Sequence, residues 1–432
     1  MASPCPLVEV PDEPVYVPLS ISSPPGAHCS EHGATRFDRG DLAGRKDRQI
    51  RGNSMDRRGF VTAGMAATLA GITGTGHLAG VLDRASFWRV GKTLPDGTVR
   101  LSSNENPLGL SPSARQAVVD AIVDANRYPS AWRRPLVDAL AKRLGVKTEN
   151  LVMGAGSTEV LQMAVQAYQK PGIPMVIAEP TFEDVPRYQR PFSYELKAIP
   201  LVESGYGHDL ERMRAAAGSG PSVVYICNPN NPTGTITSSS DVDSWIADAP
   251  EETLFLVDEA YFEYAGDPSY WTALKWIESK PNVVVVRTFS KIFAMAGMRL
   301  GYGIAHPDTA KRLTAFISAN NTNVLACAAG TASMADDGLV DRSVDVNANA
   351  KQIATSTLDD LGLEYIPTHT NFIMHRINGD LQAYIRAMRD KGIQVGRPFP
   401  PMTEWNRVSF GLPEEMGRWA DALREMRAVG TI

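Results

Sequence analysis

Short apolar runs rich in β-branched residues alternate with longer segments of helical spacing along this 432-residue chain, and this alternation constrains the fold most. The runs lie at Pro174–Ala178, Ser222–Cys227, Thr253–Asp258 and Asn282–Arg287. Successive positions in them are apolar, which indicates strands that are buried on both faces of a sheet. Because such strands alternate with helices, we predict an α/β fold with a mostly parallel sheet covered on both sides.

One intervening segment shows the helical period clearly. Its apolar residues fall on a single face of a helix, and they are Val160, Leu161, Ala164, Val165 and Tyr168. In sheets of this kind, functional side chains stand at the carboxyl ends of the strands. We therefore expect the chemistry to lie in the loops that follow the four runs.

The pattern changes near Asp341, after which helical segments alternate with runs at Asn371–Arg376, Ile393–Gly396 and Arg407–Gly411. This change predicts a smaller α+β domain beside the large one. We place the large domain at residues 130–325 and the small domain at residues 94–129 together with 326–432.

Composition argues against several kinds of partner. The net charge of −5 gives no basic patch, so we expect no nucleic-acid binding. The four cysteines show no CxxC spacing and the seven histidines form no HxxxH or HExxH cluster. We therefore expect neither a disulfide framework nor a metal site made of protein ligands alone.

The N-terminal part of the chain has a different character. Residues 1–54 are rich in Pro, Ser, Gly and charge, which predicts a disordered extension. Met55–Val61 contains two adjacent arginines followed by Phe60, and a mild apolar stretch follows. Residues 55–85 thus resemble a twin-arginine export signal, which predicts a periplasmic or extracellular protein. The alternative is a cytoplasmic protein with a non-functional tail. The apolar stretch is shorter than the roughly 20 residues of a spanning helix, so we expect no stable membrane insertion.

Two of the predicted loops offer groups for an anion and for a ring oxygen. Gly154–Glu159 precedes a helix that begins near Thr158, and the free N–H groups of a helix start bind anions. Cys227–Gly234 follows a strand and presents Asn231 between two prolines, where its amide can donate to a phenolate oxygen. Taken singly, the two patterns also fit a plain helix N-cap and an ordinary turn.

The next loop carries a carboxylate at a costly position. Asp258 ends an apolar strand, where a charge needs a cationic partner, and a protonated pyridine nitrogen would supply one. Tyr261 follows and can reach an oxygen on the same ring. The alternative for Asp258 is a buried salt bridge.

Lys291 follows the last of the four runs and can form a Schiff base with an aldehyde cofactor. Thr288, Ser290 and Arg299 flank it with hydroxyl and guanidinium groups that suit a phosphate. Phe182 can stack on the cofactor ring, or it can be a core aromatic residue. Lys291 alone also fits a surface lysine, so the interpretation rests on all the loops together.

From about Leu101 to the C-terminus, the chain resembles the fold-type-I aminotransferases of class I/II, which use pyridoxal 5'-phosphate (PLP). Within them it is most similar to the histidinol-phosphate aminotransferase-like group. The motifs that carry the resemblance are Asn104–Gly109, Tyr128–Pro129, Gly156–Glu159, Asn231–Gly234, Asp258–Tyr261, Ser290–Lys291 with Arg299, and Arg407 near Ser409–Gly411.

The resemblance implies a seven-stranded sheet and a role for each site residue. It makes Lys291 the Schiff-base lysine and places Asp258 at the pyridine nitrogen. Asn231 and Tyr261 would bind the ring oxygen. The residues expected at the cofactor phosphate are Ser157, Thr158, Thr288, Ser290, Arg299 and, from a partner subunit in a homodimer, Tyr128. The residues expected at the substrate are Arg407, which would hold its α-carboxylate, Asn104 and Leu108.

The activity implied is amino transfer between an L-amino acid, or an amino-alcohol phosphate such as histidinol phosphate, and a 2-oxo acid. Two departures leave the substrate open. Leu108 stands where the family often has an aromatic residue, and Arg397 comes one position later than the family's arginine, after Gly396. The alternatives are a PLP-dependent decarboxylase of an amino-acid phosphate and a non-catalytic PLP-fold binding protein.

Overall fold

The structure, a computed structural model, describes residues 90–430 and 432, all of which belong to one compact unit, Gly76–Ile432. The predicted extension at residues 1–54 and the predicted export signal at residues 55–85 lie outside the described residues and stay predictions. Within the described part of the chain, no helix combines the length and apolar character needed to cross a membrane.

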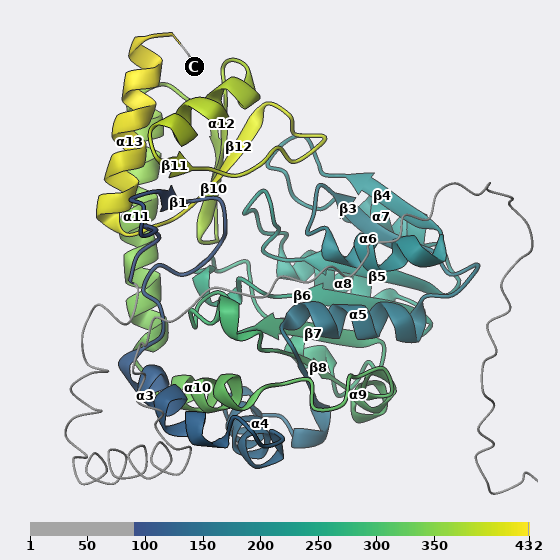
Figure 1. Ribbon diagram of the computed structural model, residues 1–432. Helices are drawn as coiled ribbons and strands as arrows, with labels where there is room; N and C mark the ends of the chain where they lie inside the picture. Colours follow the sequence, from purple (N-terminus) through teal and green to yellow (C-terminus); the bar gives the residue numbers. More distant parts are fainter. Residues whose placement is uncertain (1–89, 431) are drawn as a thin grey trace, which may run out of the picture. The chain divides into compact units, whose positions relative to one another are not determined.

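The large sheet has seven strands in the order β2-β8-β7-β6-β5-β3-β4 (Figure 1). Only β8 runs antiparallel to its neighbours, and the other pairs are parallel. The predicted α/β fold with a mostly parallel seven-stranded sheet is confirmed. The strands are β2 (Leu151–Gly154), β3 (Met175–Glu179), β4 (Leu196–Pro200), β5 (Ser222–Cys227), β6 (Thr253–Asp258), β7 (Val283–Thr288) and β8 (Gly301–Ala305).

Each face of this sheet has its own apolar core, because successive residues of a strand point to opposite faces. In β6, Phe255 and Val257 join one cluster, whereas Leu254 and Leu256 join the other. Helix α5 (Ser157–Tyr168) packs in the second cluster and α8 (Ser239–Asp248) in the first. The remaining helices are α3 (Pro112–Ala121), α4 (Ser130–Leu144), α6 (Asp184–Gln189), α7 (Leu210–Ala217), α9 (Pro307–Thr314), α10 (Val324–Met334), α11 (Leu339–Asp360), α12 (Leu381–Asp390) and α13 (Pro413–Ala428).

A smaller α+β part is built on two further sheets. One is antiparallel, with the order β12-β10-β9, and the other pairs β1 with β11 in parallel. Helices α11 and α13 pack on each other beside these sheets (Figure 1). The strands are β1 (Val99–Arg100), β9 (Tyr365–Ile366), β10 (Phe372–Arg376), β11 (Ile393–Gln394) and β12 (Trp405–Ser409).

The apolar clusters do not follow the domain boundaries predicted from the sequence. Val99 and Leu101 pack with residues from Ala350 to Ile432, whereas α3 packs on α10 next to the large sheet. Helix α10 also packs on α4, and Ala114 and Ala326 share a cluster with residues of the large sheet, so the packing crosses the predicted boundaries at 129/130 and 325/326. The division into two domains stays a prediction.

Strand β8 was not among the strands predicted from the sequence. Its two glycines, Gly301 and Gly303, reduce the strand propensity of the segment. A Cβ at Gly301 would stand 2.2 Å from the backbone nitrogen of Ser157, and one at Gly303 would stand 2.7 Å from the Val160 side chain. The glycines are needed because α5 packs directly against this strand.

Candidate active site

The loops at the carboxyl ends of the large sheet enclose a cavity of about 200 Å³. Every predicted cofactor residue except Tyr128 lines this cavity. The structure thus brings together side chains that are far apart in the sequence, and the most distant, Ser157 and Arg299, are separated by 142 positions. The lining residues are Ser157, Thr158, Phe182, Cys227, Asn231, Asp258, Ala260, Tyr261, Thr288, Ser290, Lys291, Ala296 and Arg299.

Asp258 is a buried carboxylate at the tip of β6, with 2% of its surface exposed. The Tyr225 hydroxyl donates to its Oδ2 at 2.9 Å, and the Ala260 N–H donates to its Oδ1 at 3.1 Å. Burial raises the pKa of Asp258 to about 6, in spite of these two hydrogen bonds. No ion pair within the described residues includes Asp258, so a cationic ring nitrogen fits this end of the cavity.

Lys291 stands across the same cavity. Its Nζ donates to the backbone oxygen of Asn104 at 3.1 Å and lies 5.5 Å from the centre of the Tyr261 ring. Burial, and next the charge of Arg407, lower the pKa of Lys291 to about 8. A larger fraction of the amine is therefore neutral near pH 7 than in an exposed lysine, and the neutral amine is the form that attacks an aldehyde.

The other end of the cavity suits an anion. Helix α5 begins at Ser157, so its free N–H groups and positive pole face the cavity. Arg299 donates to the Thr158 hydroxyl at 3.2 Å. Gly156 adopts a φ of 87°, and a Cβ there would stand 2.3 Å from the Arg299 guanidinium. A glycine is thus required for the guanidinium to approach the helix start, and the two together fit a phosphate.

A second pocket, of about 270 Å³, adjoins the first and shares Phe182, Asn231 and Lys291 with it. Arg407, from β12, lies in this pocket with 9% of its surface exposed. Its Nη1 donates to Asn231 Oδ1 at 2.7 Å and its Nη2 to the Ser102 oxygen at 3.2 Å. Its Nε has no hydrogen-bond partner within the described residues, so the guanidinium retains donor capacity for a ligand carboxylate.

The sequence did not indicate several charged residues that line this second pocket. Glu183 and Arg397 form an ion pair of 2.5 Å, and Asp184 and Arg187 form one of 3.1 Å. Arg397 was noted in the sequence only for its shifted position. One feature of the sequence could have indicated these residues. Glu183 directly follows Phe182, a predicted site residue, and α6 begins there, just after the carboxyl end of β3.

Two supporting contacts were also missed. Tyr225 reaches Asp258 because β5 and β6 pair with Cys227 opposite Asp258, two residues beyond the tyrosine. The Asn104 amide donates to the Tyr261 hydroxyl at 2.9 Å, which fixes both side chains at the mouth of the site. A tyrosine in an otherwise apolar strand was the signal for the first contact, since a buried hydroxyl needs a partner.

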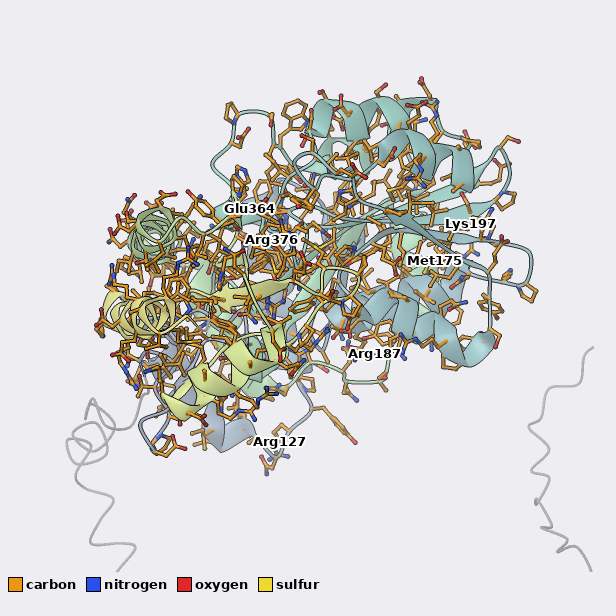
Figure 2. The ribbon with its side chains drawn as sticks, turned by 90° about the horizontal axis from the view of Figure 1, so that it is seen from above. Arg127, Met175, Arg187, Lys197, Glu364 and Arg376 are labelled. Carbon is orange, nitrogen blue, oxygen red and sulfur yellow. The ribbon has the colours of Figure 1, made fainter. Side chains whose placement is uncertain are left out.

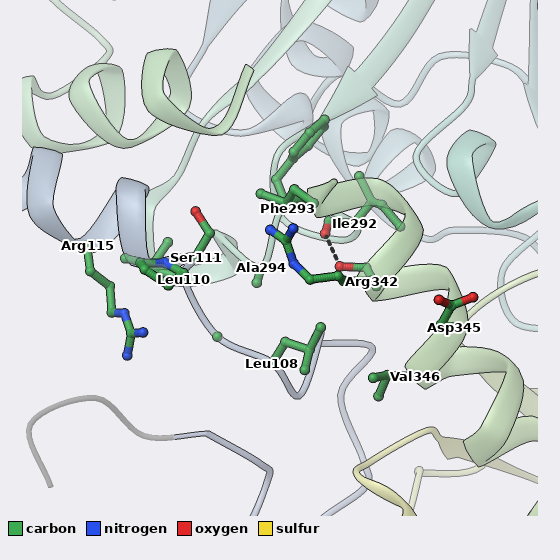
Figure 3. Close-up of a pocket in the computed structure, with 14 residues that line it drawn as sticks. Leu108, Leu110, Ser111, Arg115, Ile292, Phe293, Ala294, Arg342, Asp345 and Val346 are labelled. Atoms are coloured by element: carbon green, nitrogen blue, oxygen red, sulfur yellow. Dashed lines mark hydrogen bonds between the residues drawn. The ribbon is translucent and has the colours of Figure 1, made fainter. Parts of the chain in front are cut away.

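The structure does not bring two predicted residues to either cavity. Tyr128 is 79% exposed and lies between α3 and α4. Leu108 lines a separate pocket of about 380 Å³, together with Phe293 and Arg342 (Figure 3). Asn104, in contrast, lines the pocket of Arg407 as predicted. The roles of Tyr128 and Leu108 stay predictions.

A cavity with a cation-binding carboxylate at one end, an anion-binding helix start at the other and an amine between them accommodates PLP. The fold and the cavity together place the chain in the class of PLP-dependent enzymes of fold type I. Residues 96–423 match the family described as aminotransferase class I and II. The chain belongs to this family, and it is a PLP-dependent aminotransferase.

Individual relatives agree with this assignment. A histidinol-phosphate aminotransferase of Moorella thermoacetica is 38% identical over 336 residues, which cover 76% of this chain and 86% of that protein. The crystal structure of histidinol-phosphate aminotransferase from Sinorhizobium meliloti in complex with pyridoxal-5'-phosphate has a TM-score of 0.71 and 30% identity, and covers 76% of this chain and 90% of that chain. L-threonine-O-3-phosphate decarboxylase from Porphyromonas gingivalis, at 22% identity and a TM-score of 0.67 over 76% of this chain and 98% of that chain, shares the fold.

Proposed function

We propose that this aminotransferase takes its amino group from histidinol phosphate or from an L-amino acid and passes it to a 2-oxo acid. The observation that carries the proposal is the pocket beside Lys291, in which Arg407 is joined by Arg397 and Arg187. An L-amino acid brings a carboxylate and histidinol phosphate brings a phosphate, and a guanidinium can bind either anion. Arg397 and Arg187 pair with Glu183 and Asp184, so a bound phosphate would compete with these carboxylates for them. The named relative from Moorella thermoacetica supports the phosphate-bearing donor.

Each residue of the cavity has its own proposed contact with the cofactor. When bound, PLP supplies an aldehyde for amino groups and a ring that accepts electrons. In the proposed arrangement, Lys291 holds the cofactor covalently at rest, and Asp258 pairs with its ring nitrogen. Asn231 and Tyr261 donate toward the ring oxygen, and Phe182 stacks on the ring. The groups proposed for the cofactor phosphate are Ser157, Thr158, Thr288, Ser290 and Arg299.

Lys291 also moves the proton in the proposed reaction. With the donor in place, the neutral Lys291 amine would act as the general base that accepts the proton from the donor α-carbon. Arg407 holds the donor carboxylate, where one is present, so that this carbon faces the lysine. The protonated amine would then act as the general acid that gives this proton back.

The test is the product formed by purified protein with PLP, histidinol phosphate and a 2-oxo acid. Transamination consumes the 2-oxo acid and releases the amino acid derived from it. Carbon dioxide release from an amino-acid phosphate, without loss of the 2-oxo acid, would favour the decarboxylase instead. Screening further amino donors in the same assay identifies an L-amino acid donor.

Arg397 gives a specific prediction for the donor. We expect Arg397→Ala to raise the KM for histidinol phosphate by about tenfold, because a hydrogen bond to a charged group is lost. The KM for a donor without a phosphate should change far less. Steady-state kinetics with both donors measure the two values.

The matched control for this prediction is Arg386→Ala, which removes an exposed arginine paired with Asp380 outside the pocket. An equal KM rise for both donors in Arg397→Ala would contradict a phosphate role for this side chain. A rise in the Arg386 variant as well would indicate a general effect of lost charge.

We also propose that the protein is a homodimer in which Tyr128 reaches the partner's cofactor phosphate. The support is an exposed apolar surface around this residue, where Ile122 is 53%, Val123 80% and Tyr128 79% exposed. Arg127, its neighbour, extends away from the body of the protein (Figure 2). Large exposed apolar side chains that cluster in this way are typical of an interface.

The dimer predicts that light scattering gives twice the mass of the chain. It also predicts that Tyr128→Phe needs a higher PLP concentration for half-saturation, by about fivefold, because one hydrogen bond to phosphate is lost. Tyr194→Phe serves as the control, since Tyr194 lines neither cavity. A monomeric mass, or unchanged PLP affinity in Tyr128→Phe, would overturn the proposed contact.

A further inference from the structure

Three consecutive backbone oxygens before α3 each accept a hydrogen bond from a cationic side chain. Arg407 Nη2 donates to the Ser102 oxygen at 3.2 Å, and Lys291 Nζ donates to the Asn104 oxygen at 3.1 Å. Between them, Lys92 Nζ donates to the Ser103 oxygen at 2.8 Å. The two outer cations belong to the site described above, whereas no role has been given to Lys92.

The Asn104 side chain ties the same short segment to both halves of the structure. Its amide nitrogen donates to the Tyr261 hydroxyl at 2.9 Å, and its amide oxygen accepts from the Ser409 hydroxyl at 2.7 Å. A shift of residues 102–104 would therefore move the acceptors of Lys291 and Arg407 and the partner of Tyr261 together. Whatever fixes the Ser103 carbonyl helps to fix all of them.

Lys92 is held firmly where it can do this. Its own backbone N–H donates to the Glu415 carboxylate, and the Thr93 hydroxyl donates to Glu415 Oε1 at 2.8 Å. Its backbone oxygen accepts from the Arg100 N–H at 2.9 Å. Glu415 is itself buried, with 3% of its surface exposed, and through these two hydrogen bonds it anchors residues 92–93.

Burial of the Lys92 amine costs free energy of folding, because a charged group loses its hydration. Lys92 is 5% exposed and forms no ion pair with the described residues. Burial lowers its pKa to about 7. The charges that act on it are Glu105 and Glu415, which favour its protonation, and Lys291 and Arg407, which oppose it. The Ser103 oxygen also accepts from the Glu105 N–H at 2.8 Å. An apolar side chain of similar length at position 92 would avoid the cost of desolvation but would remove the one side-chain hydrogen bond from the described residues that holds this oxygen from outside its own segment.

We propose that Lys92 is a positioning residue, which holds the Ser103 carbonyl and thereby sets the resting places of the Lys291 amine and the Arg407 guanidinium. The proposal rests on the proposed function in that Arg407 receives the donor carboxylate and Lys291 the cofactor. Lys92 lines neither cavity, and it acts through the backbone of residues 102–104.

The test compares Lys92→Met, which keeps length and removes the donor, with Lys92→Gln, which keeps a donor without the charge. With a carboxylate-bearing amino donor, we expect Lys92→Met to raise KM by about tenfold with a smaller change in kcat, because Arg407 is misplaced. Lys92→Gln should recover part of this loss. The pH midpoint of the visible absorbance of bound PLP should move upward in Lys92→Met, since removal of a nearby cation favours protonation at Lys291.

Lys351→Met is the matched control. Lys351 is a half-buried lysine whose Nζ donates to the Thr368 backbone oxygen at 2.6 Å, and it lines neither cavity. We expect it to lose thermal stability without a change in KM or in the absorbance midpoint. If Lys92→Met is folded, and both KM and the midpoint equal those of the wild type, the proposal is overturned. Equal changes in Lys351→Met would overturn it as well.

The readouts separate the two proposals. A wild-type protein that binds PLP but transfers no amino group contradicts the proposed function, and the absorbance midpoint then still decides the role of Lys92. An active wild type with an unaltered Lys92→Met contradicts the positioning role alone. If Lys92→Met does not fold, the absorbance midpoint and KM of Lys92→Gln decide: unchanged values overturn the role.

Discussion

Lys291→Ala is expected to lower transamination by ~10⁴-fold or more, because one amine both holds the cofactor and moves the proton at the donor carbon. The structure leaves no obvious substitute among the described residues lining the cavity, where Lys291 is the only lysine. PLP should still enter the cavity of the variant, since the phosphate end and Asp258 are intact. Turnover is measured from loss of the 2-oxo acid, and cofactor binding from the visible absorbance of the dialysed protein.

The absorbance gives a second, independent check. In the wild type the covalent link to Lys291 should shift the absorbance of bound PLP away from that of free PLP, and the shift should be missing in the variant. Lys197→Ala is the control, because Lys197 lies on β4 and lines neither cavity. Full turnover by Lys291→Ala would contradict the assignment of the catalytic lysine.

Asp258→Asn should reduce turnover by roughly 10²-fold to 10³-fold, because it removes the charge that stabilises a protonated ring nitrogen while keeping the size of the side chain. Burial raises the pKa of Asp258 to about 6 in spite of its hydrogen bonds, so the carboxylate is mostly ionised at pH 7 and above even before a cation arrives. We expect PLP to bind the variant more weakly. Rates and PLP titrations measure the two effects.

A buried aspartate elsewhere provides the control for this change. Asp243 accepts from the indole N–H groups of Trp271 and Trp276 and pairs with Lys275, away from both cavities. Asp243→Asn should lower thermal stability while the rate per folded molecule stays near that of the wild type. An Asp258→Asn variant that behaves in the same way would show that Asp258 has only a structural role.

The sequence predicted the parts of the fold that depend on apolar runs. Strands β5 and β6 match the predicted runs residue for residue. Asp258 ends β6 and Lys291 follows β7, and the two meet because neighbouring parallel strands end at the same edge of a sheet. The sequence did not indicate β8, because its residues Gly301 and Gly303 are poor strand formers. They are required there by the close packing of α5, which leaves no room for a Cβ. Contacts of this kind are tertiary, and no local pattern encodes them.

In the candidate site, too, some residues could be predicted from the sequence and others could not. Residues that belong to compact motifs, such as Asn231 and Arg299, could be predicted and line the cavity. Glu183 and Arg187 could not, because their place in the second pocket depends on how α6 lies relative to the loop that carries Arg397. Tyr128 is a different case, because the contact proposed for it needs a second subunit, which a single chain does not contain.

The parallel pairing of β1 with β11 has a consequence for how the protein is made. Val99 pairs with Ile393, and the Asn104 side chain needs the Ser409 hydroxyl, so nearly the whole chain must leave the ribosome before the site can close. Contacts between such distant positions slow folding, because a long loop must be closed before they form. A chain that stops short of β12 should therefore lack both Arg407, which lines the second pocket, and the Ser409 partner of Asn104.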